Sequence, residues 1–175
     1  MRQLFVFTLL PKFTETSLVN LAMASGLLSH ALQLDYEALP SAPATGQGTY
    51  SFTFSPHADL NVTWAHTRGQ VEIDAAFIAK REGKETLFVV EAKAGDEFDS
   101  LAKHKLLFPA LALRNGIPEY MPLVPVYIRA LRRSDGFHFY VAECILSHAA
   151  DGIVSLAGLV PRAVCHLVLM GFNRT

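Results

Sequence analysis

Charged residues and cysteines are both scarce in this chain of 175 residues. Only 18% of the residues are charged, and the formal net charge is −1. A chain with so small a net charge has no general positive field to draw it onto nucleic acid, so phosphate contacts must come from local clusters. The two cysteines, Cys144 and Cys165, are too few for a disulfide framework and fit a reducing compartment. We therefore expect a cytoplasmic protein.

Several familiar sequence motifs are also absent. The sequence has no G-x-x-x-x-G-K-[ST] phosphate loop, no Cys/His spacing typical of zinc sites and no internal repeat. The apolar run near the C-terminal end is interrupted by Pro161, Arg162 and His166, which makes it a poor membrane span. These absences argue against a built-in ATP motor, a zinc site and a membrane protein.

Apolar residues, by contrast, make up 51% of the chain, which is enough for a single domain over 1–175 with a buried core. Helical spacing predicts a helix over 14–34, with Thr14 or Thr16 as its N-cap. A second helix is predicted over 97–116, and Pro109 should bend or divide it.

Alternating and β-branched patterns predict the strands. These lie at 50–54, 61–65, 71–80, 86–94, 124–133 and 136–146. The last two are joined at Ser134-Asp135-Gly136, a hairpin signal. Residues 41–48 read as a loop, 3–10 as a short strand or the lead-in to a helix, and the tail after Asp151 as a helix or strand. This order predicts an α/β domain with a mixed central sheet flanked by helices.

The central hairpin places charge inside apolar strands. Asp74, Glu91 and Lys93 stand among valines, leucines and phenylalanines. A turn at Glu82-Gly83 puts Asp74 opposite Glu91, whereas a turn one residue later puts it opposite Lys93. In either register all three side chains share one face of the sheet, because side chains alternate with period two.

Two opposed carboxylates in a partly buried sheet destabilise it, unless a cation lies between them. Mg²⁺ prefers oxygen ligands, so Asp74 and Glu91 are candidate metal ligands. Lys93, on the same face, is a candidate to hold or activate an attacking water or to stabilise a phosphorane-like transition state. The alternative is that the three residues form only a solvated polar face or a cross-strand ion pair.

The motif ID at 73–74, a tight turn, and VVEAKAG at 89–95 followed by a helix resemble the core of the PD-(D/E)XK nuclease superfamily. The resemblance is closest to restriction-endonuclease-like proteins. It covers mainly residues 71–110, with looser agreement of element order from about 14 to 146. It implies a restriction-endonuclease-like fold and a phosphodiester-cleaving site of Asp74, Glu91 and Lys93, with Mg²⁺ as cofactor and Mn²⁺ as a substitute.

The resemblance implies further residues and partners. Such nucleases often add an acidic ligand from the helix before the first core strand; Glu15 is the candidate and Glu37 the second choice. The alternative for Glu15 is a favourable interaction with the helix dipole. The substrate implied is DNA, cleaved by a homodimer that has two sites for two strands. An RNA-directed nuclease and a catalytically inactive nucleic-acid-binding or assembly module of the same fold are the rivals, and a domain without chemistry is the third.

Two basic clusters are candidates for contacts with phosphate. The first, on the predicted helix, comprises Lys103 and Lys105 with His104 between them; the second, at a strand end, comprises Arg132 and Arg133 with Arg129 nearby. The alternative is that both clusters only solvate the surface.

Overall fold

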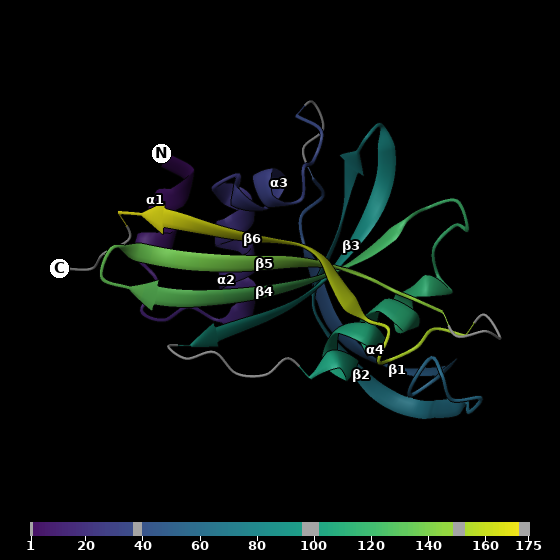
Figure 1. Cartoon of the computed structure of the whole chain (residues 1–175). Helices are drawn as coiled ribbons and strands as arrows, with labels where there is room; N and C mark the ends of the chain where they lie inside the picture. Colours follow the sequence, from purple (N-terminus) through teal and green to yellow (C-terminus); the bar gives the residue numbers. More distant parts are fainter. Residues whose placement is uncertain (1, 37–39, 96–101, 149–152, 172–175) are drawn as a thin grey trace.

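A six-stranded sheet forms the centre of the molecule (Figure 1). The computed structural model describes residues 2–36, 40–95, 102–148 and 153–171. The strands are β1 (Ala44–Phe54), β2 (Trp64–Arg81), β3 (Lys84–Gly95), β4 (Leu123–Arg133), β5 (Gly136–Ile145) and β6 (Val160–Met170). They lie side by side in chain order.

The sheet is mixed because one connection crosses over. β3 and β4 are parallel, while every other neighbouring pair is antiparallel. Helix α4 (Lys103–Arg114) lies between β3 and β4 in the chain, as a parallel connection requires. The predicted α/β class with a mixed sheet is therefore confirmed.

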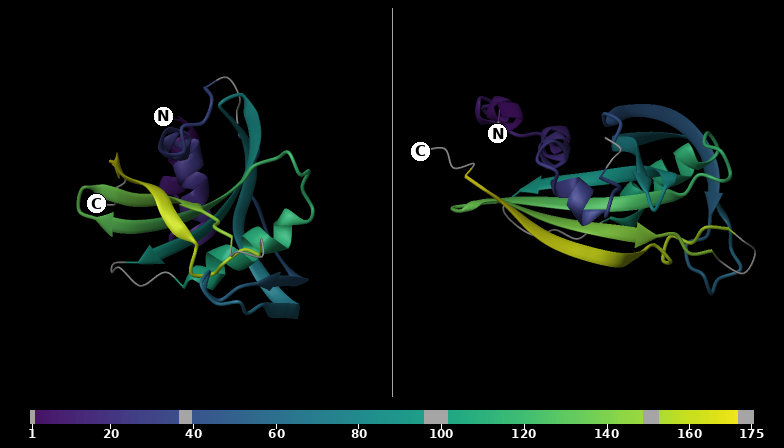
Figure 2. Two further views of the ribbon diagram at one scale, coloured as in Figure 1. Left: turned by 45° about the vertical axis from the view of Figure 1, so that its right-hand side comes forward. Right: turned by 90° about the horizontal axis from the view of Figure 1, so that it is seen from above.

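Helices cover the two faces of the sheet unequally. Helices α1 (Arg2–Thr8), α2 (Glu15–Ala24) and α3 (Leu27–Ala31) lie on one side, as the view from above shows (Figure 2). The main core lies beneath them and includes the fully buried rings of Phe77, Phe88 and Phe139. On the opposite face α4 buries Leu106 and Leu107 in a second, smaller cluster. In the described ranges, no helix has the length and hydropathy needed to cross a bilayer.

The predicted helix over 14–34 is two helices. Thr14 is the N-cap of α2, and its hydroxyl accepts a hydrogen bond of 3.1 Å from the Ser17 amide. The chain then passes through Gly26 with a φ of +76°, a left-handed conformation that ends α2 and that glycine adopts without steric cost. Residues 3–10 belong mostly to helix α1, the second of the two alternatives.

Two strand boundaries were predicted wrongly. Residues 41–48 are not all loop, because β1 already begins at Ala44, and the strand expected over 61–65 begins only at Trp64. β2 is long enough to pair with β1 from Ala44 onwards, so pairing with β2 overrides the weak strand propensity of the glycines. The tail after Asp151 ends in strand β6.

Pro109 does not divide its helix. It lies inside α4, which runs without interruption from Lys103 to Arg114. The proline is buried together with Leu106, Leu107 and Ala110, and this packing holds the helix together despite the missing amide donor. Residues 97–101 of the predicted helix lie outside the described part of the chain.

The β2–β3 turn fixes the register of the central hairpin. Glu82 and Gly83 have φ values of +52° and +74°, as in a two-residue type I′ turn. Pairing runs from Arg81↔Lys84 to Ala75↔Val90, so the first of the two predicted registers is correct. The Asp35 carboxylate accepts hydrogen bonds from the amides of Glu82 at 3.0 Å and Gly83 at 2.9 Å. The loop after α3 thus holds the turn in place.

We predict that Asp35→Ala lowers the free energy of unfolding by about 1–2 kcal/mol, because two amides of the turn lose a charged acceptor. Urea denaturation measures this change. Glu85→Ala, an exposed carboxylate on the same hairpin, is the matched control and should change stability by less than about 0.5 kcal/mol. Equal effects of the two substitutions would show that Asp35 does not stabilise the turn.

Candidate active site

The sheet forks at Asp74. Pairing between β2 and β3 stops at Ala75↔Val90. The first half of β2 continues beside β1, and the end of β3 continues beside β4 as far as Gly95. Figure 1 shows β1 and the first half of β2 diverging from β3. At the fork the Asp74 side chain takes the place of the backbone ladder, because its Oδ2 accepts a hydrogen bond of 2.9 Å from the Ala92 amide. The site begins where the two strands separate.

Glu91 lies buried in the fork, with 5% of its surface exposed. Burial, followed by the negative charge of Asp74, raises the pKa of its carboxyl to about 7. Both effects disfavour the ionised form, and the contact with Lys93 offsets them only in part. Without a cation, therefore, the Glu91 carboxyl keeps its proton up to about pH 7.

Lys93 stands between the acidic residues. Its Nζ donates a hydrogen bond of 2.9 Å to Glu15 Oε1 and lies 3.1 Å from Glu91 Oε1. The second contact is an ion pair, and Glu91 Oε1 is buried with no hydrogen bond among the described residues. Burial acts to lower the pKa of Lys93, but Glu15 and Glu91 outweigh it and raise the pKa above its ordinary value. The side chain stays an ammonium ion.

These four side chains open into one cleft between β2 and α4. The cleft has a volume of about 280 Å³. Its walls comprise Glu15, Gln70, Val71, Glu72, Asp74, Glu91, Lys93, His104, Lys105, Phe108 and Pro109. The structure therefore brings together Asp74, Glu91, Lys93 and Glu15, which the sequence singled out, and adds the start of α4.

The basic residues named in the sequence analysis lie in different parts of the structure. Lys105 lines the cleft, whereas the Nζ of Lys103 donates a hydrogen bond of 2.8 Å to the Ala157 carbonyl and so ties α4 to the segment before β6. Arg132 lines a different pocket, and Arg133 is exposed at the end of β4. Glu37, the second choice for an acidic ligand, lies outside the described residues.

Sequence reasoning missed Tyr127 of β4, and it placed Arg129 of the same strand in the basic cluster at the strand end. Tyr127 and Arg129 pair in register with Glu91 and Lys93 on the parallel neighbour β3, so they share the face of the sheet that carries the site. Burial raises the pKa of Tyr127. Arg129 is only 3% exposed, although the sequence grouped it with an exposed cluster. The signal was available, because Arg129 interrupts an apolar strand just as Lys93 does.

The donor set fits a hard divalent cation better than zinc. Within the described ranges no group of three or more His, Cys, Asp or Glu residues is arranged to hold a metal, and Glu15 is engaged by Lys93. Asp74 and Glu91 remain as two opposed oxygen donors, with Glu91 Oε1 lacking a hydrogen bond. One or two carboxylates, completed by water and substrate phosphate, are a common environment for Mg²⁺.

Fold and site together define an α/β protein whose forked mixed sheet holds an Asp, Glu and Lys cluster in a cleft. The chain belongs to the family described as "Domain of unknown function (DUF6997)", whose model matches residues 6–146. That range holds all four residues of the site and ends before β6. No curated protein and no solved structure matches the chain.

The raised pKa of Glu91 predicts how stability depends on pH in metal-free protein. The folded state holds the Glu91 proton up to about pH 7, whereas the unfolded chain releases it near 4.5. The stabilisation is therefore complete below the unfolded pKa and is lost as pH rises through the folded one. Between these two pH values the free energy of unfolding of Glu91→Gln should rise relative to that of the wild type by about 1.4 kcal/mol per pH unit, and by up to about 3 kcal/mol in total.

Urea denaturation with a chelator at several pH values between 4.5 and 8 measures this difference. Glu85→Gln, exposed on the same strand, should follow the wild-type profile. If the Glu91→Gln and wild-type profiles run parallel, Glu91 titrates normally and the opposed pair is not under strain.

Proposed function

We propose that this chain is a metal-dependent endonuclease that hydrolyses phosphodiester bonds in DNA on a restriction-endonuclease-like fold. The observation that carries the proposal is the convergence of Asp74, Glu91 and Lys93 at the fork of the sheet, in a cleft. The element order also supports it, since the β2–β3 hairpin leads through α4 into a parallel strand.

Each side chain has a role that its surroundings favour. Asp74 and Glu91 would hold Mg²⁺ or Mn²⁺, which when bound supplies Lewis acidity toward a phosphate oxygen. Lys93 remains protonated, so it would orient the attacking water and stabilise negative charge developing on the phosphate, rather than remove a proton. The raised pKa thus favours one of the two roles that the sequence left open.

Glu15 and Lys105 would act on either side of these three residues. Glu15 accepts the hydrogen bond that aims the Lys93 ammonium, which makes it a positioning residue as well as a candidate ligand. Lys105, at the start of α4, lines the same cleft and is suited to contact a phosphate of the bound strand. The substrate would therefore enter between β2 and α4.

We predict that supercoiled plasmid is cleaved in the presence of Mg²⁺ or Mn²⁺, and that Asp74→Asn and Lys93→Ala each slow cleavage by at least about 100-fold. The matched controls are Asp59→Asn and Lys80→Ala, whose side chains are exposed away from the cleft; these should keep the wild-type rate. Cleavage that survives both site substitutions would overturn the proposal, and cleavage of RNA alone would assign the site to an RNA-directed nuclease.

In this proposal two copies of the chain cut both strands at one place, because the described part of each chain contributes the cleft of Asp74, Glu91 and Lys93. The proposal therefore includes a homodimer. The plasmid assay should give linear product with a rate that rises more steeply than the protein concentration. Nicked circles alone, with a rate proportional to protein concentration, would indicate that a monomer acts.

Binding of the cation can be measured without cleavage. Saturating Mg²⁺ or Mn²⁺ should raise the melting temperature, since a ligand of the folded state stabilises it by mass action. A concentration of 100 Kd corresponds to about 2.7 kcal/mol. The increase should vanish in Asp74→Asn and persist in Asp59→Asn. If the wild type and Asp59→Asn bind DNA but their melting temperatures do not rise with metal, an inactive nucleic-acid-binding module is favoured.

A further inference from the structure

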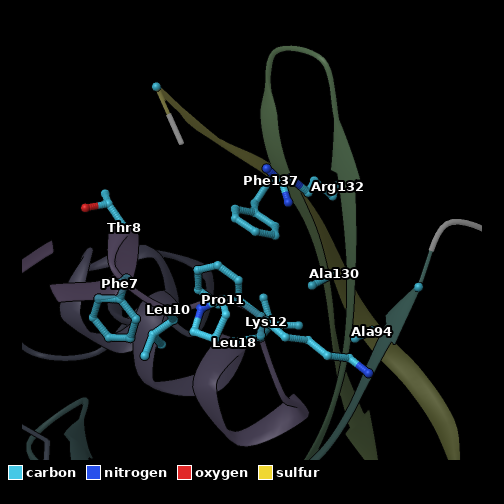
Figure 3. A pocket seen from close by; sticks show the side chains of 13 residues that line it. Phe7, Thr8, Leu10, Pro11, Lys12, Leu18, Ala94, Ala130, Arg132 and Phe137 are labelled. Atoms are coloured by element: carbon cyan, nitrogen blue, oxygen red, sulfur yellow. The ribbon is translucent and has the colours of Figure 1, made fainter. Parts of the chain in front are cut away.

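A second cavity lies at the C-terminal ends of β3 and β4, on the face of the sheet covered by α1 and α2 (Figure 3). Its volume is about 230 Å³. The lining is mostly apolar and includes three phenylalanines, Phe7, Phe13 and Phe137. Ala94 and Ala130 form its floor on the sheet. Nothing in the proposed cleavage reaction uses this pocket.

Two cations stand at its rim. Lys12 extends from the connection between α1 and α2 toward Ala94, and Arg132 lies beside Phe137 (Figure 3). Both residues are exposed, and neither has a hydrogen bond or ion pair with any residue of the described ranges. Two exposed cations over an apolar floor are complementary to a ligand that has both an anionic and an apolar part.

The aromatic lining narrows the class of ligand. Phe13 and Phe137 pack edge to face, with ring centroids 4.9 Å apart, so rigid rings form one wall of the pocket. Phenylalanine rings stack on nucleobases of any sequence, and Lys and Arg neutralise the phosphates between them. The small volume suits one base rather than a larger ligand, since pockets for drug-sized molecules start at roughly 300 Å³.

The pocket adjoins the candidate active site. Ala94 and Gly95 of the pocket directly follow Lys93 of the cleft in β3. On the helical side, Lys12 of the pocket precedes Glu15 of the cleft by three residues, a span of at most about 11 Å. The two cavities therefore adjoin the same short segments, the end of β3 and the start of α2, with Lys93 and Ala94 pointing to opposite faces of the sheet. A strand of nucleic acid that passes around the end of β3 would reach both.

We infer that this pocket binds one nucleotide of the strand that is cut in the cleft. Its base would lie among the phenylalanine rings, and Lys12 and Arg132 would hold the adjoining phosphates. The pocket would thereby fix the register of the strand relative to Asp74 and Glu91. This inference rests on the proposed function for its biological meaning, but binding to the pocket requires neither metal nor cleavage.

The test titrates the full chain, in chelator, with deoxyadenosine 5′-monophosphate, followed by nuclear magnetic resonance shifts. We expect saturable binding that weakens at least about tenfold in the double variant Lys12→Ala and Arg132→Ala, since charge-assisted contacts are lost. Ala94→Leu, which places a larger side chain in the pocket and leaves both cations in place, should weaken it to a similar extent. Lys80→Ala and Ala163→Leu, at exposed positions outside the pocket, are the matched controls and should bind like wild type.

Several results would overturn the inference. One is the absence of binding, and another is equal binding by wild type and the pocket variants. Inorganic phosphate binding as tightly as the nucleotide would show that the base is not recognised, and tighter binding of decanoate would assign the pocket to an apolar chain. Failure of the nuclease proposal appears separately, as a wild-type protein that binds the nucleotide here but cleaves no plasmid.

Discussion

Two carboxyl groups, from Asp74 and Glu91, face one another where the central sheet forks, and the arrangement around them depends on how their repulsion is relieved. In the absence of a cation the repulsion raises the pKa of Glu91 to about 7, because this carboxyl is buried and lies beside Asp74. Lys93 offsets only part of this repulsion, since its ammonium group also pairs with Glu15. A buried pair of this kind weakens a sheet, and the proposed cation would reverse that effect.

The rest of the fold holds this pair in position. The type I′ turn at Glu82-Gly83, tied to Asp35, sets the register that opposes Asp74 to Glu91. The fork separates β2 from β3 at this point, so the two carboxylates line a cleft and are not enclosed in the hydrophobic core. Helix α2 supplies Glu15 from one side and α4 supplies Lys105 from the other. Elements distant in sequence thus converge on one short stretch of two strands.

Local patterns predicted the parts of this site that lie within a single hairpin. The alternation along 71–80 and 86–94 was sufficient to place Asp74, Glu91 and Lys93 on one face of the sheet. The observed turn at Glu82-Gly83 then chose Glu91, rather than Lys93, as the residue opposite Asp74. Elsewhere, long-range contacts made the local predictions wrong. β1 extends through glycines because β2 pairs with it, and Pro109 stays helical because it is buried. The separation of Lys103 from Lys105 and the burial of Arg129 depend on neighbours that no local pattern reveals. Tyr127 and Arg129 join the site only through the parallel register of β3 with β4.

The most direct test of a cation between the two carboxylates is a crystal structure of the protein grown with Mn²⁺ and measured at the manganese absorption edge. The account predicts an anomalous peak in the fork, with one oxygen of Asp74 and one of Glu91 at about 2.0–2.2 Å from it, and with Glu91 bound as a carboxylate. A fork with no anomalous peak at saturating Mn²⁺, in which Glu91 keeps its contacts with Asp74 and Lys93, would contradict it.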